Sequence, residues 1–242
     1  MRFDDQFAII VPMANEEPDF EPFINELKAV LDWLKMGRVY CIVDDVSIDR
    51  TLALCKDLSK NDNRFVTVYA PEDRNVVGAY LRGYREAFDN GHPIIIEMDA
   101  GMSHDPKAIP LFLGALEQGN ECAFGSRFMK SGSMQNSSFS RFVLSRGGTL
   151  LANALLGTKL SDMTSGFEGF HRHIVKELLD HKFRSTAHFF QTELRYFMRS
   201  KKFAEVPIHY KTPSPRVSRG AIRNSINVLL YYFLRRVAHR EP

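Results

Sequence analysis

Polar side chains, most of them acidic, follow three short apolar segments in the first hundred residues. The three groups are Asn15, Glu16 and Glu17 after residues 7–12, Asp44 and Asp45 after residues 39–43, and Asp99 after residues 93–98. Acids that gather in one place repel one another, so a cation or hydrogen-bond donors must compensate them. The edge of a nucleotide base supplies donors, and its ribose supplies hydroxyls. These residue types therefore predict a site for a nucleotide, a cation or both.

Some of these polar residues also have a purely structural interpretation. Asp49 can cap a helix that begins near it, and Glu16 and Glu17 can form the solvated start of another helix. Asp105 stands before Pro106, which is typical of a helix N-cap followed by proline at the first helical position. The two adjacent aspartates of the second group are harder to explain in this way, and they favour a ligand.

Several common nucleotide and catalytic motifs are absent from the sequence. No GxGxxG follows the first apolar segment, no GxxxxGK[ST] occurs, and no GxSxG occurs. These absences argue against a dehydrogenase-type dinucleotide fold, a P-loop and a hydrolase with a nucleophile elbow.

Short apolar segments alternate with helical patterns over the first half of the chain. The apolar segments span residues 7–12, 39–43, 65–70, 93–98 and 122–125, and the helical patterns span residues 20–34, 49–58, 76–89 and 106–117. This alternation predicts an α/β fold in which helices cover both faces of a parallel sheet. Ligands bind beyond the carboxyl ends of the strands in such a sheet, which is where the acidic groups stand.

The second half of the chain has a different pattern. Residues 126–140 form a polar, serine-rich connection, and the pattern after it predicts helices at 141–156, 172–180 and 187–200 and a strand at 203–210. No internal repeat and no clear linker separates the halves. We expect one domain, with a nucleotide-binding sheet in front and an acceptor-handling half behind.

Composition narrows the functional class and the location. The chain has 242 residues, 44% of them hydrophobic, which suffices for a sizeable core. Its net charge is +3, but the segment from Arg195 onward holds eleven Lys or Arg and only two acids, so we expect an anionic partner. The three cysteines favour a reducing cytosol over disulfides or a zinc site. The start of the chain shows no signal peptide, and the apolar run 228–234 is too short to span a bilayer, which predicts a cytoplasmic protein, with peripheral contact to the inner membrane face left open.

Six motifs in order resemble a known family. They read IIVPMANEE, VDDVSIDRT, MDAGMSHDP, GSRF, SDMTSGFEGFHR and EVPIHY, and the similarity that they mark covers roughly residues 7–219. This pattern resembles glycosyltransferase family 2 enzymes of the dolichyl-phosphate mannosyltransferase type. The resemblance implies a GT-A fold, in which a mostly parallel sheet binds a nucleotide-diphosphate sugar.

The resemblance also implies roles for individual residues. Nucleotide binding would fall on Pro12, Asn15, Glu17, Asp44 and Asp45. Mg²⁺ or Mn²⁺ would be held by Asp99 and Ser103, and phosphate in the active site would meet Arg127, Arg141 and Ser145. Asp162 would lie near the reacting centre, while Ser218 and Arg219 would contact the acceptor phosphate.

These roles have a simple electrostatic basis. Charge builds on the departing nucleoside diphosphate, and a metal ion and arginine side chains stabilise it. A lipid phosphate acceptor is already ionised, so Arg127 and Arg141 need only orient it. A sugar hydroxyl would need a general base, for which Asp162 is the candidate. Alternatively, each arginine forms a surface ion pair and Asp162 is only a turn residue.

The metal motif departs from the family pattern at one position. Gly101 stands where the second acid of the motif is expected. Mg²⁺ tolerates the loss because it often keeps several waters and binds substrate phosphates. We therefore expect a metal that Asp99 and the diphosphate hold, more weakly than is usual.

The C-terminal segment, residues 220–242, has the pattern of a basic amphipathic helix after a transferase domain at 1–219. Its apolar residues at helical spacing are Ile222, Ile226, Leu229, Leu230, Phe233 and Val237, flanked by Arg223, Arg235, Arg236 and Arg240. Such a helix can lie on an anionic membrane surface, or it can pack on the domain or on another subunit.

The sequence thus predicts an inverting, metal-assisted glycosyltransferase. The resemblance implies transfer of a hexose to a polyprenyl or dolichyl phosphate, with mannose from GDP-mannose as the first expectation and a UDP-sugar as another donor. One alternative is direct transfer to a hydroxyl of a glycan or small molecule. A second is a degenerate, non-catalytic module that binds nucleotide-sugars. Nucleic-acid binding is not favoured, and an oligomer remains open.

Overall fold

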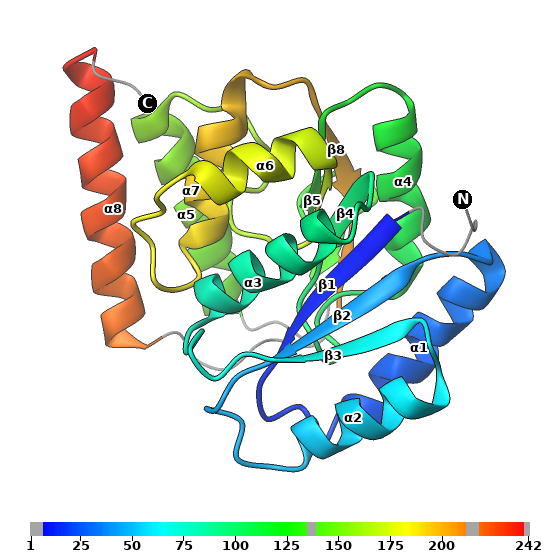
Figure 1. The fold of residues 1–242 in the computed structure, drawn as a ribbon. Helices are drawn as coiled ribbons and strands as arrows, with labels where there is room; N and C mark the ends of the chain where they lie inside the picture. Colours follow the sequence, from blue (N-terminus) through cyan, green and yellow to red (C-terminus); the bar gives the residue numbers. More distant parts are fainter. Residues whose placement is uncertain (1–6, 135–138, 212–217, 240–242) are drawn as a thin grey trace.

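A computed structural model describes residues 7–134, 139–211 and 218–239 of the 242-residue chain (Figure 1), and the side chains of Ser140 and Arg219 also lie outside this description. The polypeptide forms a central sheet with helices on both faces. Within the described residues, the sheet has seven strands in the order β3-β2-β1-β4-β7-β5-β8. These strands are β1 (Phe7–Met13), β2 (Arg38–Val43), β3 (Phe65–Tyr69), β4 (Ile94–Glu97), β5 (Cys122–Ser126), β7 (Glu168–His171) and β8 (Phe203–Pro207).

Parallel pairing joins β3, β2, β1 and β4, whereas β7 runs antiparallel between β4 and β5. The predicted mostly parallel α/β sheet is confirmed. We did not predict β7, whose four residues lie within a motif that the sequence pattern left unassigned. A segment of four residues is too short for its sequence pattern to identify it as a strand. Its pairing with β4 and β5 identifies it in the structure. A second, two-stranded sheet pairs β6 (Ser133–Met134) with β9 (His209–Tyr210).

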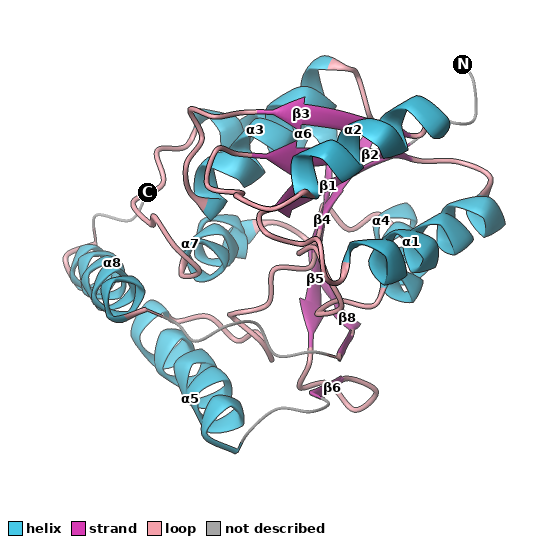
Figure 2. Cartoon of the chain, turned by 90° about the horizontal axis from the view of Figure 1, so that it is seen from below, coloured by secondary structure: helices cyan, strands magenta, loops and turns pink. Residues whose placement is uncertain are grey.

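Alternate residues of β1 face opposite sides of the sheet, as in any strand buried on both faces. Ala8 and Ile10 enter one core, while Phe7, Ile9 and Val11 enter the other. The second core is closed by α1 (Phe20–Leu34), α2 (Thr51–Asn61) and α4 (Ile109–Glu117), and the first by α3 (Val76–Asp89), α6 (Arg172–Asp180) and α7 (Phe190–Phe197). Figure 2 shows α1 and α4 on one side of β4 and β5, and α7 on the other.

Local chemistry explains where several of these helices begin. The Asn75 side chain accepts hydrogen bonds from the backbone N–H groups of Val77 and Gly78, which caps α3. Asp105 accepts from Lys107 N at 3.1 Å at the start of a short 3₁₀ turn, Pro106–Ala108, so the predicted cap before the proline is confirmed.

Two long helices, α5 (Phe139–Leu156) and α8 (Arg219–Val237), pack against each other at one side of the molecule (Figure 1). Most of the predicted apolar stripe of α8 is exposed in the structure: Leu229 is buried, but Ile222, Ile226, Leu230 and Val237 are exposed. The buried face consists of Val228, Leu229 and Tyr232, which enter the first core. One face of α8 thus packs on the domain, and another face of the same helix meets solvent. In the described parts of the chain, no helix combines the length and hydrophobicity that a bilayer span requires.

Candidate active site

Hydrogen bonds join the loops after β1 and β2, and two of the residues that form them, Asn15 and Glu17, are ones that the sequence analysis assigned to nucleotide binding. The Asn15 backbone has a positive φ of 59°, and its N–H donates to Ser47 Oγ at 3.1 Å. Ile48 N donates in turn to Asn15 Oδ1 at 3.0 Å. Glu17 Oε2 accepts from Arg50 N at 2.9 Å. These contacts hold the two loops in one fixed shape at the carboxyl edge of the sheet.

The other predicted nucleotide-binding residues lie at the same edge. Pro12 is half-buried near the end of β1. Asp44 is buried and accepts from Val46 N at 3.1 Å, while Asp45 accepts from Arg74 Nη2 at 2.7 Å. The structure therefore brings the five residues together, although their contact with a nucleotide stays a prediction.

Asp99 lies two residues beyond the end of β4, and two neighbouring side chains fix its orientation. Tyr80 OH donates to Asp99 Oδ1 at 2.5 Å, and Asp99 N donates to His104 Nδ1 at 3.1 Å. Burial lowers the pKa of His104, so the ring is neutral and carries its proton on Nε2. The Asp99 side chain remains 41% exposed, and its second oxygen, Oδ2, lies 3.8 Å from His104 Nε2, beyond hydrogen-bond distance.

A second carboxylate lies beside the loop that carries Asp99. A Cβ atom built on Gly101 would be 3.0 Å from Glu16 Oε2, so this oxygen occupies the space of an absent side chain. Burial, together with the charges of Asp99, Asp19 and Asp49, raises the pKa of Glu16 to about 7.

This oxygen-rich edge suits a hard divalent cation. Among the described residues no group of three or more His, Cys, Asp or Glu side chains could hold an ion alone, so the rest of its ligands would be substrate phosphates and water. Ser103, which the sequence analysis placed at the metal, is buried and does not line the cavity described next.

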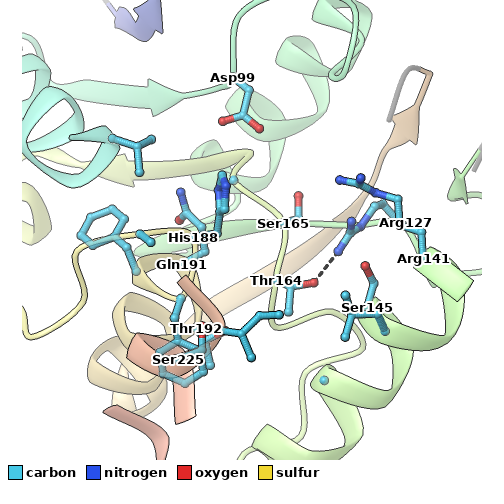
Figure 3. A pocket seen from close by; sticks show the side chains of 18 of the residues that line it. Asp99, Arg127, Arg141, Ser145, Thr164, Ser165, His188, Gln191, Thr192 and Ser225 are labelled. Atoms are coloured by element: carbon cyan, nitrogen blue, oxygen red, sulfur yellow. Dashed lines mark hydrogen bonds between the residues drawn. The ribbon is translucent and has the colours of Figure 1, made fainter. Parts of the chain in front are cut away.

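A cavity of about 290 Å³ opens next to Asp99. Figure 3 shows Asp99 on one side of it and Arg127, Arg141 and Ser145 on the other. Thr164, Ser165 and the start of α7 form its floor, and α8 contributes Ile222, Ser225, Ile226 and Leu229. The cavity thus joins three segments that lie far apart in the sequence.

Arg127 follows β5 and forms a buried ion pair with Asp162. Arg127 Nε donates to Asp162 Oδ2 at 2.7 Å, and Nη2 donates to Asp162 Oδ1 at 2.9 Å. Burial opposes ionisation of Asp162, but Arg127 and Arg195 outweigh it and lower the pKa of the carboxyl to about 2. Asp162 is fully buried and does not line the cavity, whereas Arg127 does. Arg127 Nη1 has no hydrogen-bond partner in the described portion of the chain.

Arg141 and Ser145 lie one helical turn apart on α5, so both side chains face the cavity. Arg141 Nη2 donates to Tyr210 OH at 3.5 Å. Ser218 lies elsewhere, as the N-cap of α8 that accepts from Ala221 N at 3.1 Å, and does not line the cavity. The side chain of Arg219 falls outside the described residues.

Sequence reasoning missed a supporting arginine beneath the cavity. Arg195 on α7 is fully buried, pairs with Glu168 Oε1 at 2.7 Å and donates to the backbone carbonyl groups of Gly125, Asp162 and Ser165. It therefore joins the end of β5 to the loop before β7. The sequence signal was weak, because a single arginine in a helix normally indicates a solvated face.

The cavity has an apolar wall between α5 and α8. Leu144 and Leu151 of α5 face Ile222, Ile226 and Leu229 of α8 across it. The exposed surface nearby carries further apolar side chains: Phe142, Val143, Leu150, Leu230, Leu234 and Val237. A polar end at Asp99 and the arginines thus leads to an apolar end at the surface.

Comparisons with known proteins agree with this geometry. The family model described as glycosyl transferase family 2 matches residues 8–179. The polyprenol monophosphomannose synthase of Mycolicibacterium smegmatis is 27% identical over 214 residues, 87% of this chain and 79% of that protein. The undecaprenyl-phosphate mannosyltransferase of Micrococcus luteus is 29% identical over 199 residues, 78% of this chain and 81% of that protein. The chain aligns with only 47% of the dolichol-phosphate mannosyltransferase of Pyrococcus furiosus, at 29% identity over 171 residues, or 70% of this chain.

Solved structures show the same fold. Glucosyl-3-phosphoglycerate synthase of Mycobacterium tuberculosis, in complex with Mn²⁺, UDP and glucosyl-3-phosphoglycerate, matches with a TM-score of 0.68 at 17% identity, covering 93% of this chain and 79% of that one. The same enzyme with Mg²⁺ and UDP matches with a TM-score of 0.64 at 17% identity, over 93% of this chain and 78% of that one. The GT-A fold predicted from the sequence is confirmed.

The family match extends over more than two thirds of the chain, and the parallel strands, the acidic edge and the arginine-lined cavity all fall where such a fold places its site. The chain belongs to glycosyl transferase family 2 and is a glycosyltransferase.

Proposed function

We propose that the enzyme transfers mannose from a nucleotide-diphosphate sugar, first of all GDP-mannose, to a polyprenyl phosphate. Two curated relatives that align over most of their length carry names describing mannosyl transfer to polyprenol or to undecaprenyl phosphate. The observation that carries the proposal is the two-ended cavity. Its arginines suit a phosphate, and its apolar wall between α5 and α8 suits a hydrocarbon tail.

The acidic edge would bind the donor. Asn15, Glu17, Asp44 and Asp45 would contact the base and ribose, and Asp99, which lines the cavity, would meet the diphosphate. A Mg²⁺ or Mn²⁺ ion held at Asp99 would neutralise the negative charge of the leaving diphosphate.

The arginine end would bind the acceptor. Arg127 and Arg141 would orient the acceptor phosphate, and Asp162 keeps the Arg127 guanidinium in place through two hydrogen bonds. A phosphate monoester is ionised at neutral pH, so no general base is required. A phosphate oxygen attacking from the face opposite the diphosphate would invert the configuration of the sugar carbon. Asp162 is poorly suited to act as a base because its carboxylate is fully engaged in the ion pair.

The exposed apolar residues of α5 and α8 would rest on a membrane surface, where the acceptor lipid resides. Leu230, Leu234 and Val237 are exposed on α8, and Arg223 is exposed on the same helix. This combination favours peripheral contact with an anionic leaflet. Vesicles containing anionic lipid should bind the protein, and Leu230→Ser/Leu234→Ser should weaken binding on the order of 100-fold, because the two leucines together lose roughly 3 kcal/mol of transfer free energy. Equal binding by the variant would rule this surface out.

Transfer of labelled mannose tests the proposed reaction. The assay would combine GDP-mannose with a short-chain polyprenyl phosphate, the corresponding polyprenol, or 3-phosphoglycerate, with and without EDTA. We expect product only with the lipid phosphate, and loss of product with EDTA. Product with the polyprenol or with 3-phosphoglycerate, and none with the lipid phosphate, would replace the proposal with a different acceptor class.

A further inference from the structure

The loop after β4 offers one carboxylate where two are expected. Asp99 is followed two residues later by Gly101, whose backbone has a positive φ of 70°. This conformation favours glycine, and an L-amino acid there would be strained. We propose that Glu16, from the loop after β1, supplies the second carboxylate of the metal site in place of a side chain at position 101. The inference rests on the proposed use of a metal-bound nucleotide donor.

Neighbouring strands bring the two loops together. β1 and β4 are parallel partners, with Ile10 opposite Glu97, so the loops that follow the two strands leave the sheet at the same edge. A Cβ atom at position 101 would lie 3.0 Å from Glu16 Oε2, and the next atom, Asp19 Cβ, would be 3.9 Å away. The Glu16 carboxylate thus lies next to the place where a side chain at position 101 would begin, beside the loop that carries Asp99.

The carboxylate of Glu16 is not used by the protein itself. Its backbone N–H donates to Thr51 Oγ1 at 2.8 Å, but its side chain makes no hydrogen bond or ion pair with the described residues. Asp19 is likewise without a side-chain partner among the described residues, but it is exposed. Three other nearby acids do bond within the protein. Glu17 accepts from Arg50 N, Asp45 pairs with Arg74, and Asp49 accepts from Thr51 N.

Carboxylates that gather at a half-buried edge repel one another, and either a proton or a cation relieves the repulsion. Mg²⁺ and Mn²⁺ take oxygen ligands, and one or two protein carboxylates together with substrate phosphates are a usual set for Mg²⁺. Glu16 and Asp99 provide that number without an acid at position 101. This arrangement explains how the motif functions with glycine, and it predicts that Glu16 affects metal affinity rather than nucleotide affinity.

Mn²⁺ binding to the full chain tests the inference without sugar or acceptor, so a failure of the proposed transfer reaction would not affect it. Titration calorimetry and the electron paramagnetic resonance signal of unbound Mn²⁺ would be measured with GDP present, for the wild type, Glu16→Gln and Glu21→Gln. Glu21 is the matched control, since it is exposed in the first turn of α1. We expect Glu16→Gln to weaken Mn²⁺ binding at least about tenfold, and Glu21→Gln to leave it unchanged.

Two further readouts separate a metal ligand from other roles. GDP affinity in EDTA should be the same for Glu16→Gln and the wild type, because the carboxylate would contact the ion and not the nucleoside. Metal-free Glu16→Gln should melt at an equal or higher temperature, since one of two repelling charges is gone. Unchanged Mn²⁺ affinity, or an equal loss of GDP affinity with and without Mn²⁺, would overturn the inference; the second result would assign Glu16 to the nucleoside.

Discussion

Asp99 and Asp162 are both acids at the candidate active site, yet the fold neutralises the charge of only one of them. Asp162 is fully buried and neutralised by two hydrogen bonds from Arg127. Asp99 is 41% exposed, and its described partners are a tyrosine hydroxyl and a neutral histidine. Asp162 thus holds Arg127 in place, whereas the Asp99 carboxylate stays accessible to the metal ion that we propose for it.

The same contrast extends to the surroundings of each acid. Below the acceptor end, Arg195 pairs with Glu168 and binds three backbone carbonyl groups, so the supporting charges are matched inside the protein. At the donor edge, Glu16 adds another acid without a matching cation among the described residues. The charges beneath the cavity are thus matched within the fold, whereas the proposed donor edge would need an ion or hydrogen-bond donors from its substrate.

The largest expected effect is on the buried ion pair. Asp162→Ala should lower the free energy of unfolding by about 3–5 kcal/mol, because it leaves the Arg127 charge buried without its partner. Urea unfolding of the variant measures this change. An Arg127→Met/Asp162→Asn double variant should recover much of the stability while remaining inactive. A stable Asp162→Ala protein would show that the pair is not what positions the guanidinium.

Asp99 should behave in the opposite manner. Asp99→Asn keeps an acceptor for the Tyr80 hydroxyl, so the melting temperature should hardly change. The turnover number should fall about 100-fold or more, because the metal loses a carboxylate. Full activity in this variant, measured with saturating Mn²⁺, would remove the difference between the two acids.

Acid should weaken the buried pair by a smaller amount. Asp162 has a folded pKa of about 2, below its ordinary 3.8, so its stabilising contribution is present above pH 3.8 and is lost as the pH falls through 2. Between pH 5 and pH 2 the wild type should lose about 2 kcal/mol more than the Arg127→Met/Asp162→Asn variant. Parallel stability curves for the two proteins, from urea unfolding at each pH, would contradict this expectation.

The smallest effect should come from the residue that orients Asp99. Tyr80→Phe removes one hydrogen bond to the carboxylate, worth about 1 kcal/mol, and should reduce Mn²⁺ affinity by roughly fivefold. Turnover at saturating metal should be nearly that of the wild type, and this split separates orientation of the ligand from catalysis. Tyr84→Phe on the same helix is the control, because its hydroxyl bonds to Glu97 and not to Asp99. An equal loss of Mn²⁺ affinity in both variants would point to a general disturbance of α3.

Much of the fold could be predicted because its signals are local. The apolar segments at 7–12 and 39–43 became β1 and β2 within a residue, and the helical pattern at 20–34 became α1 with the same bounds. The strand β7 was missed because its antiparallel place between β4 and β5 depends on two partners far away in the chain. The helix at 187–200 was predicted too long, and α7 begins only at Phe190.

The site was predictable in its members more than in its contacts. Residue types and order placed Asp99, Arg127, Arg141 and Ser145 in one site, and the structure brings them to one cavity. The sequence by itself determined which strands and helices form and which charged groups stand at their ends, since these depend on near neighbours. Only the tertiary structure decided which charges are matched: it buried Asp162 against Arg127 and placed Glu16 at the empty position beside Gly101. Whether a charge is neutralised depends on distance in space, and residues thirty or more positions apart acquire that distance only when the chain folds.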